Sequence, residues 1–138
     1  STLENNIKTL AQYHKLQSNI TTSIITLHEL DKTIQHLQDI GVADVYYFNV
    51  LQTPKFMNIN LLPTSCKQQL LDDLDLQRFS NVHGYEHLKN VLFSEQENKQ
   101  DIIGQFKWYN EKLDKVRNTD LRVANPQLWK LLYETDKV

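Results

Sequence analysis

The sequence predicts an α/β fold, with parallel strands and helices in its first half and helices alone in its second half. One observation is a β-branched run at residues 18–26, and another is an apolar and aromatic run at residues 42–51. Between and after these runs, apolar residues recur at helical spacing. A strand, a helix and a second strand at this spacing form a right-handed crossover with parallel strands. We therefore divide the chain into a β/α unit at residues 1–62 and a helical extension at residues 63–138.

The helices of the first half are expected from their end signals. Ser1 and Glu4 fit a capping box, which predicts that the first helix begins at the start of the chain. Thr26 and Glu29 fit a second capping box, which predicts the start of the helix between the strands. Gly41 follows the apolar stripe of that helix and is expected to end it in a left-handed conformation.

The second strand is expected to be covered on both faces, because its apolar run is nearly continuous rather than alternating. Two strands cannot bury both faces of such a sheet, and no third strand is evident in the sequence. Residues 57–62 are a weak candidate, since Asn58, Asn60 and Pro63 favour irregular backbone. Either the later helices wrap a very small sheet, or the missing strands belong to a segment or partner outside this chain.

The second half is expected to be helical throughout. Pro63 suits the first turn of a helix that runs towards Arg78, and a shorter helix is expected at residues 85–93. Apolar residues at alternating spacings of four and three predict a longer helix over residues 102–116. Asn125 precedes a proline and is expected to cap the last short helix.

Composition excludes several classes of function. The formal net charge of −2 gives no basic field, so a nucleic-acid partner is not expected. No apolar run approaches the roughly 20 residues that cross a bilayer, so we expect a cytoplasmic protein without a membrane partner. Cys66 is the only cysteine, which excludes an internal disulfide, a Cys-rich zinc site and an iron–sulfur cluster held by this chain alone.

One short motif matches a metal site. His83, Glu86 and His87 fit the H-x-x-E-H pattern of zinc peptidases, in which two histidines on one helical face hold Zn²⁺ and the glutamate activates water. Gly84 disfavours the helix that this geometry needs, and no third ligand is identifiable. Two solvated histidines at the entry to a helix are the favoured interpretation, so we expect no metal.

Three further groups of residues have a functional and a structural interpretation. Cys66 lies beside Lys67 near a helix start, a position that lowers a thiol pKa, but a structural or surface cysteine is favoured. A solvated helix face is favoured over a cation site for the acidic residues Asp72, Asp73 and Asp75. Core packing is favoured over an aromatic binding surface for Trp108, Tyr109, Trp129 and Tyr133.

Asn49 is a polar residue late in an apolar strand, near the carboxyl end where parallel sheets place their ligands. A polar group in that position has to be hydrogen-bonded, either to the fold or to a ligand. Both interpretations stay open at this point.

Several motifs occur in an order and spacing that carry a family resemblance. They are residues 5–10, Ile20-Thr-Thr-Ser-Ile-Ile25, Tyr47-Phe-Asn-Val-Leu51 with Pro54, Leu61-Leu-Pro63 and Lys67, and Phe106-x-x-Tyr109 with Leu113-Asp114, Arg117 and Asn125-Pro-x-Leu128. Through most of its length the chain resembles the later part of radical SAM proteins that have a short twitch-type C-terminal extension.

The resemblance implies a partial barrel of parallel strands, of which this chain would carry only the last two, followed by the helical extension. It also implies S-adenosylmethionine (SAM) and a [4Fe–4S] cluster in the intact protein. The cluster motif C-x-x-x-C-x-x-C is absent from this chain, which is therefore expected to hold neither group alone. By this resemblance Asn49 and Thr26 are the residues that would face SAM or the substrate.

The resemblance therefore predicts the C-terminal part of a radical SAM enzyme, inactive alone and completed by a missing N-terminal barrel half. The substrate would be a small molecule or a peptide. The first alternative is a non-catalytic interaction module that completes its sheet with a partner chain. A minor alternative is a zinc hydrolase that uses His83, Glu86 and His87.

Overall fold

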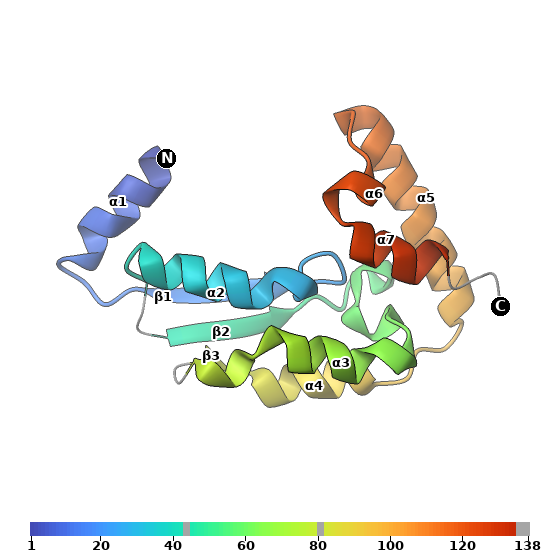
Figure 1. Ribbon diagram of the computed structural model, residues 1–138, viewed down its shortest axis with the longest axis horizontal. Helices are drawn as coiled ribbons and strands as arrows, with labels where there is room; N and C mark the ends of the chain where they lie inside the picture. The colour runs from blue at the N-terminus through green and yellow to red at the C-terminus, as the bar shows by residue number, and fades with distance from the viewer. Residues whose placement is uncertain (43–44, 80–81, 135–138) are drawn as a thin grey trace.

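The computed structural model describes residues 1–42, 45–79 and 82–134. In these residues the fold is α/β, with a parallel sheet of three strands in the order β1-β2-β3 (Figure 1). The strands are β1 (Gln17–Thr22), β2 (Val45–Val50) and β3 (Val82–His83). The α/β class and the parallel pairing of the first two strands are confirmed.

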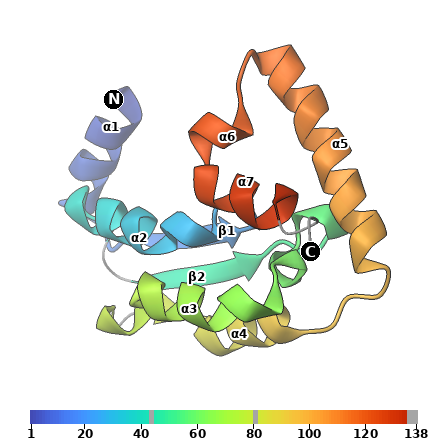
Figure 2. The same ribbon diagram turned by 45° about the vertical axis from the view of Figure 1, so that its right-hand side comes forward.

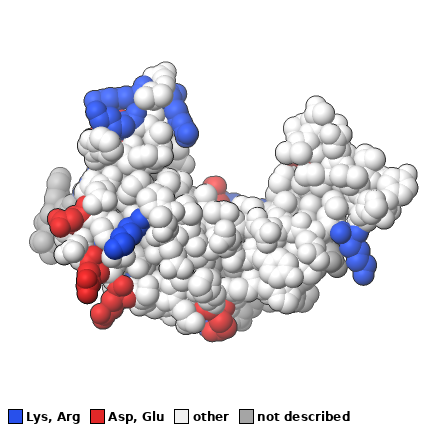
Figure 3. Space-filling model, turned by 180° about the vertical axis from the view of Figure 1, so that it is seen from behind, with Lys and Arg blue, Asp and Glu red and all other residues white. Residues whose placement is uncertain are grey.

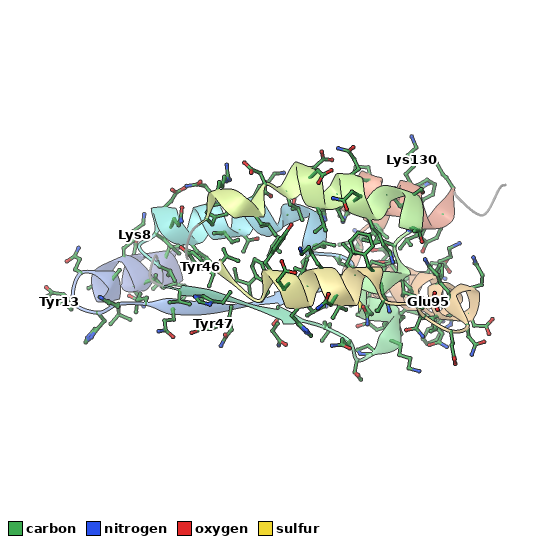
Figure 4. All side chains as sticks on the ribbon, turned by 90° about the horizontal axis from the view of Figure 1, so that it is seen from below. Lys8, Tyr13, Tyr46, Tyr47, Glu95 and Lys130 are labelled. Atoms are coloured by element: carbon green, nitrogen blue, oxygen red, sulfur yellow. The ribbon has the colours of Figure 1, made fainter. Side chains whose placement is uncertain are left out.

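The helices of the described residues connect the strands and then extend beyond the sheet. They are α1 (Thr2–Ala11), α2 (Leu30–Asp39), α3 (Thr64–Leu74), α4 (Tyr85–Phe93), α5 (Lys99–Arg117), α6 (Leu121–Ala124) and α7 (Pro126–Tyr133). Helix α2 connects β1 to β2 and helix α3 connects β2 to β3, and both lie on the same side of the strands (Figure 4). None of the helices in this part of the chain combines the length and the apolar character needed to cross a membrane.

The third strand corrects the expectation that the chain has only two. Val82 pairs with Tyr46, and His83 pairs with Tyr47. Gly84 then turns the chain into α4 at a φ of +90°, a conformation that side chains rarely adopt. A Cβ at this position would lie 3.3 Å from the carbonyl oxygen of Phe48, so glycine also allows the close approach to β2.

Strand β2 alternates between a buried and an exposed face, so the prediction that it is covered on both faces was wrong. Tyr46, Phe48 and Val50 are buried, whereas Tyr47 and Asn49 on the opposite face are exposed. The reason is that both crossover helices pack on one side of the sheet. Residues 43–44, at the start of the predicted strand, lie outside the described residues.

The core is one hydrophobic cluster that draws on both predicted parts of the chain. Ile34 and Tyr46 come from the β/α unit, and Leu88 and Phe106 come from the helical extension, and all four are fully buried. Burial of each such side chain contributes roughly 1.5–3 kcal/mol of stability. The helical extension therefore shares a core with the sheet.

Two of the predicted helix ends are confirmed, and so is the glycine that follows α2. The backbone N–H of Glu4 donates to the Ser1 hydroxyl at 3.2 Å, and the Glu4 carboxylate accepts from the terminal ammonium group at 3.0 Å. The side-chain oxygen of Asn125 accepts from the backbone N–H of Leu128 at 3.0 Å. Gly41 has the positive φ, +100°, that was expected at the end of α2.

The second capping box does not form. Thr26 precedes a short 3₁₀ turn, and its hydroxyl oxygen accepts a hydrogen bond from the backbone N–H of Ser23 at 2.9 Å instead of from Glu29. The α-helix proper begins only at Leu30. The predicted box was wrong because the threonine side chain stabilises the turn before it rather than the helix after it.

The helices of the second half differ from expectation mainly at their ends. The helix predicted at residues 85–93 is confirmed as α4. Pro63 occupies the N-cap position of α3, one residue before the first turn in which it was expected. Helix α3 ends before Arg78, because Asp75 adopts a left-handed conformation with a φ of +44°. In α5 the apolar repeat continues past the core, and Val116 is 85% exposed.

The two ends of the chain rise from the same side of the layer formed by the sheet, α2, α3 and α4 (Figures 1 and 2). Helix α1 stands at one end and contributes no buried residue. Helices α5, α6 and α7 stand at the other end (Figure 2). The buried residues of α5 lie between Ile102 and Asn110, and α6 and α7 add Leu121, Leu128 and Leu132 to the core.

Candidate functional site

The candidate site is the side of the sheet that no described helix covers, which we call the open face. Its side chains alternate with the buried ones along each strand, and none carries a formal charge when histidine is neutral. They are Gln17, Asn19, Thr21, Val45, Tyr47, Asn49 and His83. Tyr47 and the buried Tyr46 point to opposite sides of the sheet (Figure 4). The view from behind shows a broad area without Lys, Arg, Asp or Glu between the two raised ends (Figure 3).

The parallel register arranges the open face in rows. Asn19, Tyr47 and His83 lie side by side on three neighbouring strands. The rings of Tyr47 and His83 are in contact, with centroids 5.5 Å apart and an interplanar angle of 31°. Thr21 pairs with Asn49 in the row nearer the carboxyl ends of the strands. The open face therefore presents one row that contains the two rings of Tyr47 and His83. Nearer the carboxyl ends of the strands, a second row contains the hydroxyl of Thr21 and the amide of Asn49.

Asn49 lies on this face and is exposed. Within the part of the chain that the structure describes, its side chain has no hydrogen-bond partner. The sequence allows two interpretations of this residue, a hydrogen bond to the fold or to a ligand. No described group forms the hydrogen bond that the first interpretation requires. The amide is available to a ligand that lies over the carboxyl ends of β1 and β2.

Thr26 lies in the turn after β1, and its hydroxyl is already engaged. The oxygen accepts from the backbone N–H of Ser23, lies 3.3 Å from the Ser23 hydroxyl and donates to the Thr21 carbonyl at 3.5 Å. These bonds fix the turn that leads from the sheet into α2. The structure gives Thr26 a role in positioning this turn, and no hydrogen bond joins it to Asn49.

The residues of the zinc motif do not share a helical face. His83 belongs to strand β3, whereas Glu86 and His87 belong to α4, and Gly84 separates the two elements. Glu86 forms an ion pair with Lys89 at 2.8 Å. Among the described residues no group of three His, Cys, Asp or Glu side chains is arranged to hold a metal ion.

Cys66 is half-buried in the first turn of α3, where its thiol donates to the Pro63 carbonyl at 3.1 Å. Burial raises the pKa of this thiol, and the nearby charges of Lys67 and Lys99 only oppose that rise. The functional interpretation, a thiol pKa lowered beside Lys67, is therefore not met, because loss of solvation is the larger effect, and the half-buried, hydrogen-bonded thiol agrees with the favoured structural interpretation.

The acidic residues of α3 form a solvated helix face. Asp72 and Asp73 are exposed, and they accept hydrogen bonds from Gln68 and Gln69 at 2.9 and 2.7 Å. Asp75 is also exposed, and its backbone ends the helix. The solvated interpretation of these residues is confirmed.

The aromatic residues of the C-terminal helices are only partly core residues. Trp108 is 62% exposed, so the prediction of core packing was wrong at this position. Tyr109 packs on Phe56 with ring centroids 5.0 Å apart, and Trp129 stacks on Tyr133 with centroids 5.4 Å apart. The stacked pair lines an open cavity of about 430 Å³ beside the exposed end of α5.

Sequence reasoning missed most of the open face because it interpreted the second strand as a continuous apolar run. The missed residues are Asn19, Thr21 and Tyr47. The available signal was alternation, since Asn19 and Thr21 flank Ile20, and Tyr47 and Asn49 flank Phe48. Polar side chains at every second position predict a strand with one face uncovered.

Comparison of the chain with protein-family models, with curated proteins and with solved structures gives no match. The functional interpretation therefore rests on the residues and the geometry described above.

Proposed function

We propose that this chain is the C-terminal part of a radical SAM enzyme, in which the open face lines the inside of a partial barrel. One observation carries the proposal. Three parallel strands follow one another in chain order, with both crossover helices on one side and an uncharged, uncovered face on the other. The motifs from Ile20 to Leu128 that resemble this family agree with that arrangement.

The winding of the sheet favours a barrel over an open doubly wound sheet. In a barrel of alternating strands and helices, the helices cover the outside and the strands present alternate side chains to the interior. A doubly wound sheet instead has helices on both of its faces. Parallel sheets are almost always covered on both sides, so the open face of this chain calls for a covering ligand or segment.

The edge of the sheet and helix α1 support the same proposal. Strand β1 pairs only with β2 among the described residues, so the backbone groups along its outer edge have no ladder partner there. Helix α1 leaves Leu3 69% exposed and Leu10 50% exposed. In the proposed barrel a preceding strand pairs with this edge, and α1 packs on the outside of that strand.

The residues of this chain do not fit an iron–sulfur cluster. Such clusters are held by several cysteine thiolates, whereas this chain has only Cys66, whose half-buried thiol is hydrogen-bonded to a carbonyl oxygen. The family uses SAM together with a [4Fe–4S] cluster, and we assign both to the missing barrel half. The role proposed for this chain is to close the barrel wall and to present Asn49 to SAM or to a small-molecule or peptide substrate.

The experiment is to join the chain to the reading frame that precedes it and to reconstitute iron and sulfide under anaerobic conditions. With SAM and dithionite, we expect the joined protein to form 5′-deoxyadenosine and the 138-residue chain alone to form none. The proposal is wrong if the chain alone forms this product. It is equally wrong if the preceding frame lacks a cluster of three cysteines.

A second candidate is a non-catalytic module that completes its sheet with a partner chain. The unpaired edge of β1 and the uncovered face favour this candidate as well, because a partner strand could pair with the edge while another part of the partner packs on the face. The two candidates differ in their ligand. An assembled complex that binds no SAM would support the interaction module, whereas SAM binding that depends on Asn49 would support the enzyme.

A further inference from the structure

We propose that a pocket between the starts of α3 and α5 binds a small organic anion through Lys67 and Lys99. The pocket has a volume of about 370 Å³ and shares no residue with the open face. The lining residues that matter here are Asn60, Thr64, Lys67, Phe93, Glu95 and Lys99. The proposal does not depend on the radical SAM assignment.

Lys67 is a buried cation without a counter-ion. Its side chain is only 4% exposed, and its ammonium group donates to the backbone carbonyl of Asn60 at 3.0 Å. No carboxylate among the described residues pairs with it. A buried ammonium group is strongly destabilised unless its charge is compensated, and two of its three N–H groups have no protein acceptor here.

Lys99 places a second positive charge in the same pocket. Its ammonium group donates to the backbone carbonyl of Leu62 at 3.0 Å. Burial lowers the pKa of Lys67, and the charge of Lys99 lowers it further, so the two ammonium groups repel each other. Glu95 also lines the pocket, but it is exposed and pairs with neither lysine in the described structure. An anion between the two lysines would remove this repulsion.

The helix ends at the pocket add to the positive potential. Helix α3 begins at Thr64 and α5 begins at Lys99, and neither helix has a side-chain hydrogen bond at its N-cap. The first N–H groups of a helix have no intrahelical acceptor and favour an anion. Two such ends therefore act in the same direction as the two lysines.

Asn60 indicates what else the ligand carries. This side chain is 4% exposed, and its Oδ1 atom has no hydrogen-bond partner. The orientation of the amide is set by Ser94, which accepts from Asn60 Nδ2 at 3.2 Å because its own proton goes to Val91 O at 2.7 Å. The Oδ1 atom is enclosed, so a ligand hydroxyl group would reach it only after neighbouring side chains shift, whereas the 45% exposed ring of Phe93 favours an organic ligand directly.

The test uses three probes and calorimetric titration. Glycerol 3-phosphate and glycerate carry a phosphate and a carboxylate beside hydroxyl groups, and inorganic phosphate carries the anion alone. We expect at least one of the two organic anions to bind more tightly than inorganic phosphate. Whichever of them binds identifies the acid group that the pocket prefers.

The variants are Lys67→Met, Lys99→Gln and, as a matched control, Lys130→Gln. Lys130 is an exposed lysine of α7 that lies away from Glu95 and the pocket (Figure 4). We expect each pocket variant to bind the organic anion with an affinity at least about tenfold lower than the parent, because a charge-assisted hydrogen bond is lost. The control is expected to bind like the parent.

Two results would overturn the proposal. One is the absence of binding by all three probes up to about 10 mM, a concentration at which even a weak specific site is occupied. The other is unchanged affinity in folded Lys67→Met and Lys99→Gln proteins. Should Lys67→Met fail to fold, Lys99→Gln decides alone, because Lys99 is only partly buried.

Discussion

At the scale of single residues, the burial of Lys67 makes stability depend on pH. Its folded pKa lies below the ordinary 10.5, so between the folded value and 10.5 the unfolded chain binds more protons. The contribution of this group to the free energy of unfolding therefore rises with pH through that window. We predict that Lys67→Met is more stable than the parent at neutral pH and that this advantage shrinks towards pH 10.5.

Urea unfolding of both proteins, measured from about pH 7 to about pH 10.5 in buffer without phosphate or organic acids, gives the two stability curves. The matched control is Lys130→Gln, which replaces an exposed lysine of α7. A constant difference between Lys67→Met and the parent would contradict the prediction.

Cys66 is predicted to react slowly in the folded protein. Burial raises the pKa of its thiol, and the thiolate is the reactive form. We expect iodoacetamide at neutral pH to modify Cys66 about tenfold or more slowly in the folded chain than in urea. Mass spectrometry over time measures both rates. Equal rates would mean that the thiol is as accessible and as acidic as in an unfolded chain.

Single residues also show how far local sequence rules reach. The caps at Ser1 and Asn125 could be predicted, because each side chain bonds a backbone N–H three residues along the chain. Thr26 has the same local signature, yet its hydroxyl accepts from Ser23 on the other side. Which backbone N–H the Thr26 hydroxyl binds depends on the path of the chain as it leaves β1. The residues around Thr26 do not determine that path.

At the scale of elements, helix α1 is folded locally and contributes little to the core. It has no buried residue, and Leu10 is 50% exposed, whereas Leu30 at the start of α2 is 2% exposed. We predict that Leu30→Ala lowers the free energy of unfolding by about 2–5 kcal/mol, while Leu10→Ala lowers it by less than about 0.5 kcal/mol. Urea denaturation of the two variants measures both values. Similar losses would show that α1 packs on this chain more closely than described.

The strands differ in how well the sequence predicts them. The β-branched and aromatic runs were enough to predict β1 and β2 and their parallel pairing. Strand β3 has only two residues, Val82 and His83, and it exists because they meet Tyr46 and Tyr47. A strand this short leaves no alternation to recognise. Its position depends on the packing of α3 and α4, which is a property of the tertiary structure.

At the scale of the whole molecule, the helices that connect the strands lie on one side of the sheet only. Helices α2 and α3 cover one side of the sheet, and the alternation of buried and exposed side chains follows from that arrangement. The sequence left open whether the later helices wrap a very small sheet or strands lie outside this chain; among the described residues the outer edge of β1 has no partner strand, and the second alternative stays a proposal. The uncovered face, which becomes the candidate site, was missed because the alternation of Tyr47 and Asn49 with Phe48 was interpreted as a continuous apolar run.

The open face offers the sharpest test at this scale. Asn49→Lys places a charge on an exposed position, so we expect the isolated chain to keep its stability within about 0.5 kcal/mol. If the proposed barrel exists, the same lysine would be buried inside it, where an uncompensated charge is strongly unfavourable. We therefore predict that Asn49→Lys abolishes assembly with the missing half and the formation of 5′-deoxyadenosine.

Asn90→Lys is the matched control, since Asn90 is exposed on α4 and lies outside the open face. Urea denaturation of both isolated variants, and assembly and SAM cleavage with the missing half, make up the complete measurement. We expect Asn90→Lys to behave like the parent in every assay. If Asn49→Lys also assembles and cleaves SAM like the parent, the open face does not line the barrel interior, because a lysine there would have to be buried.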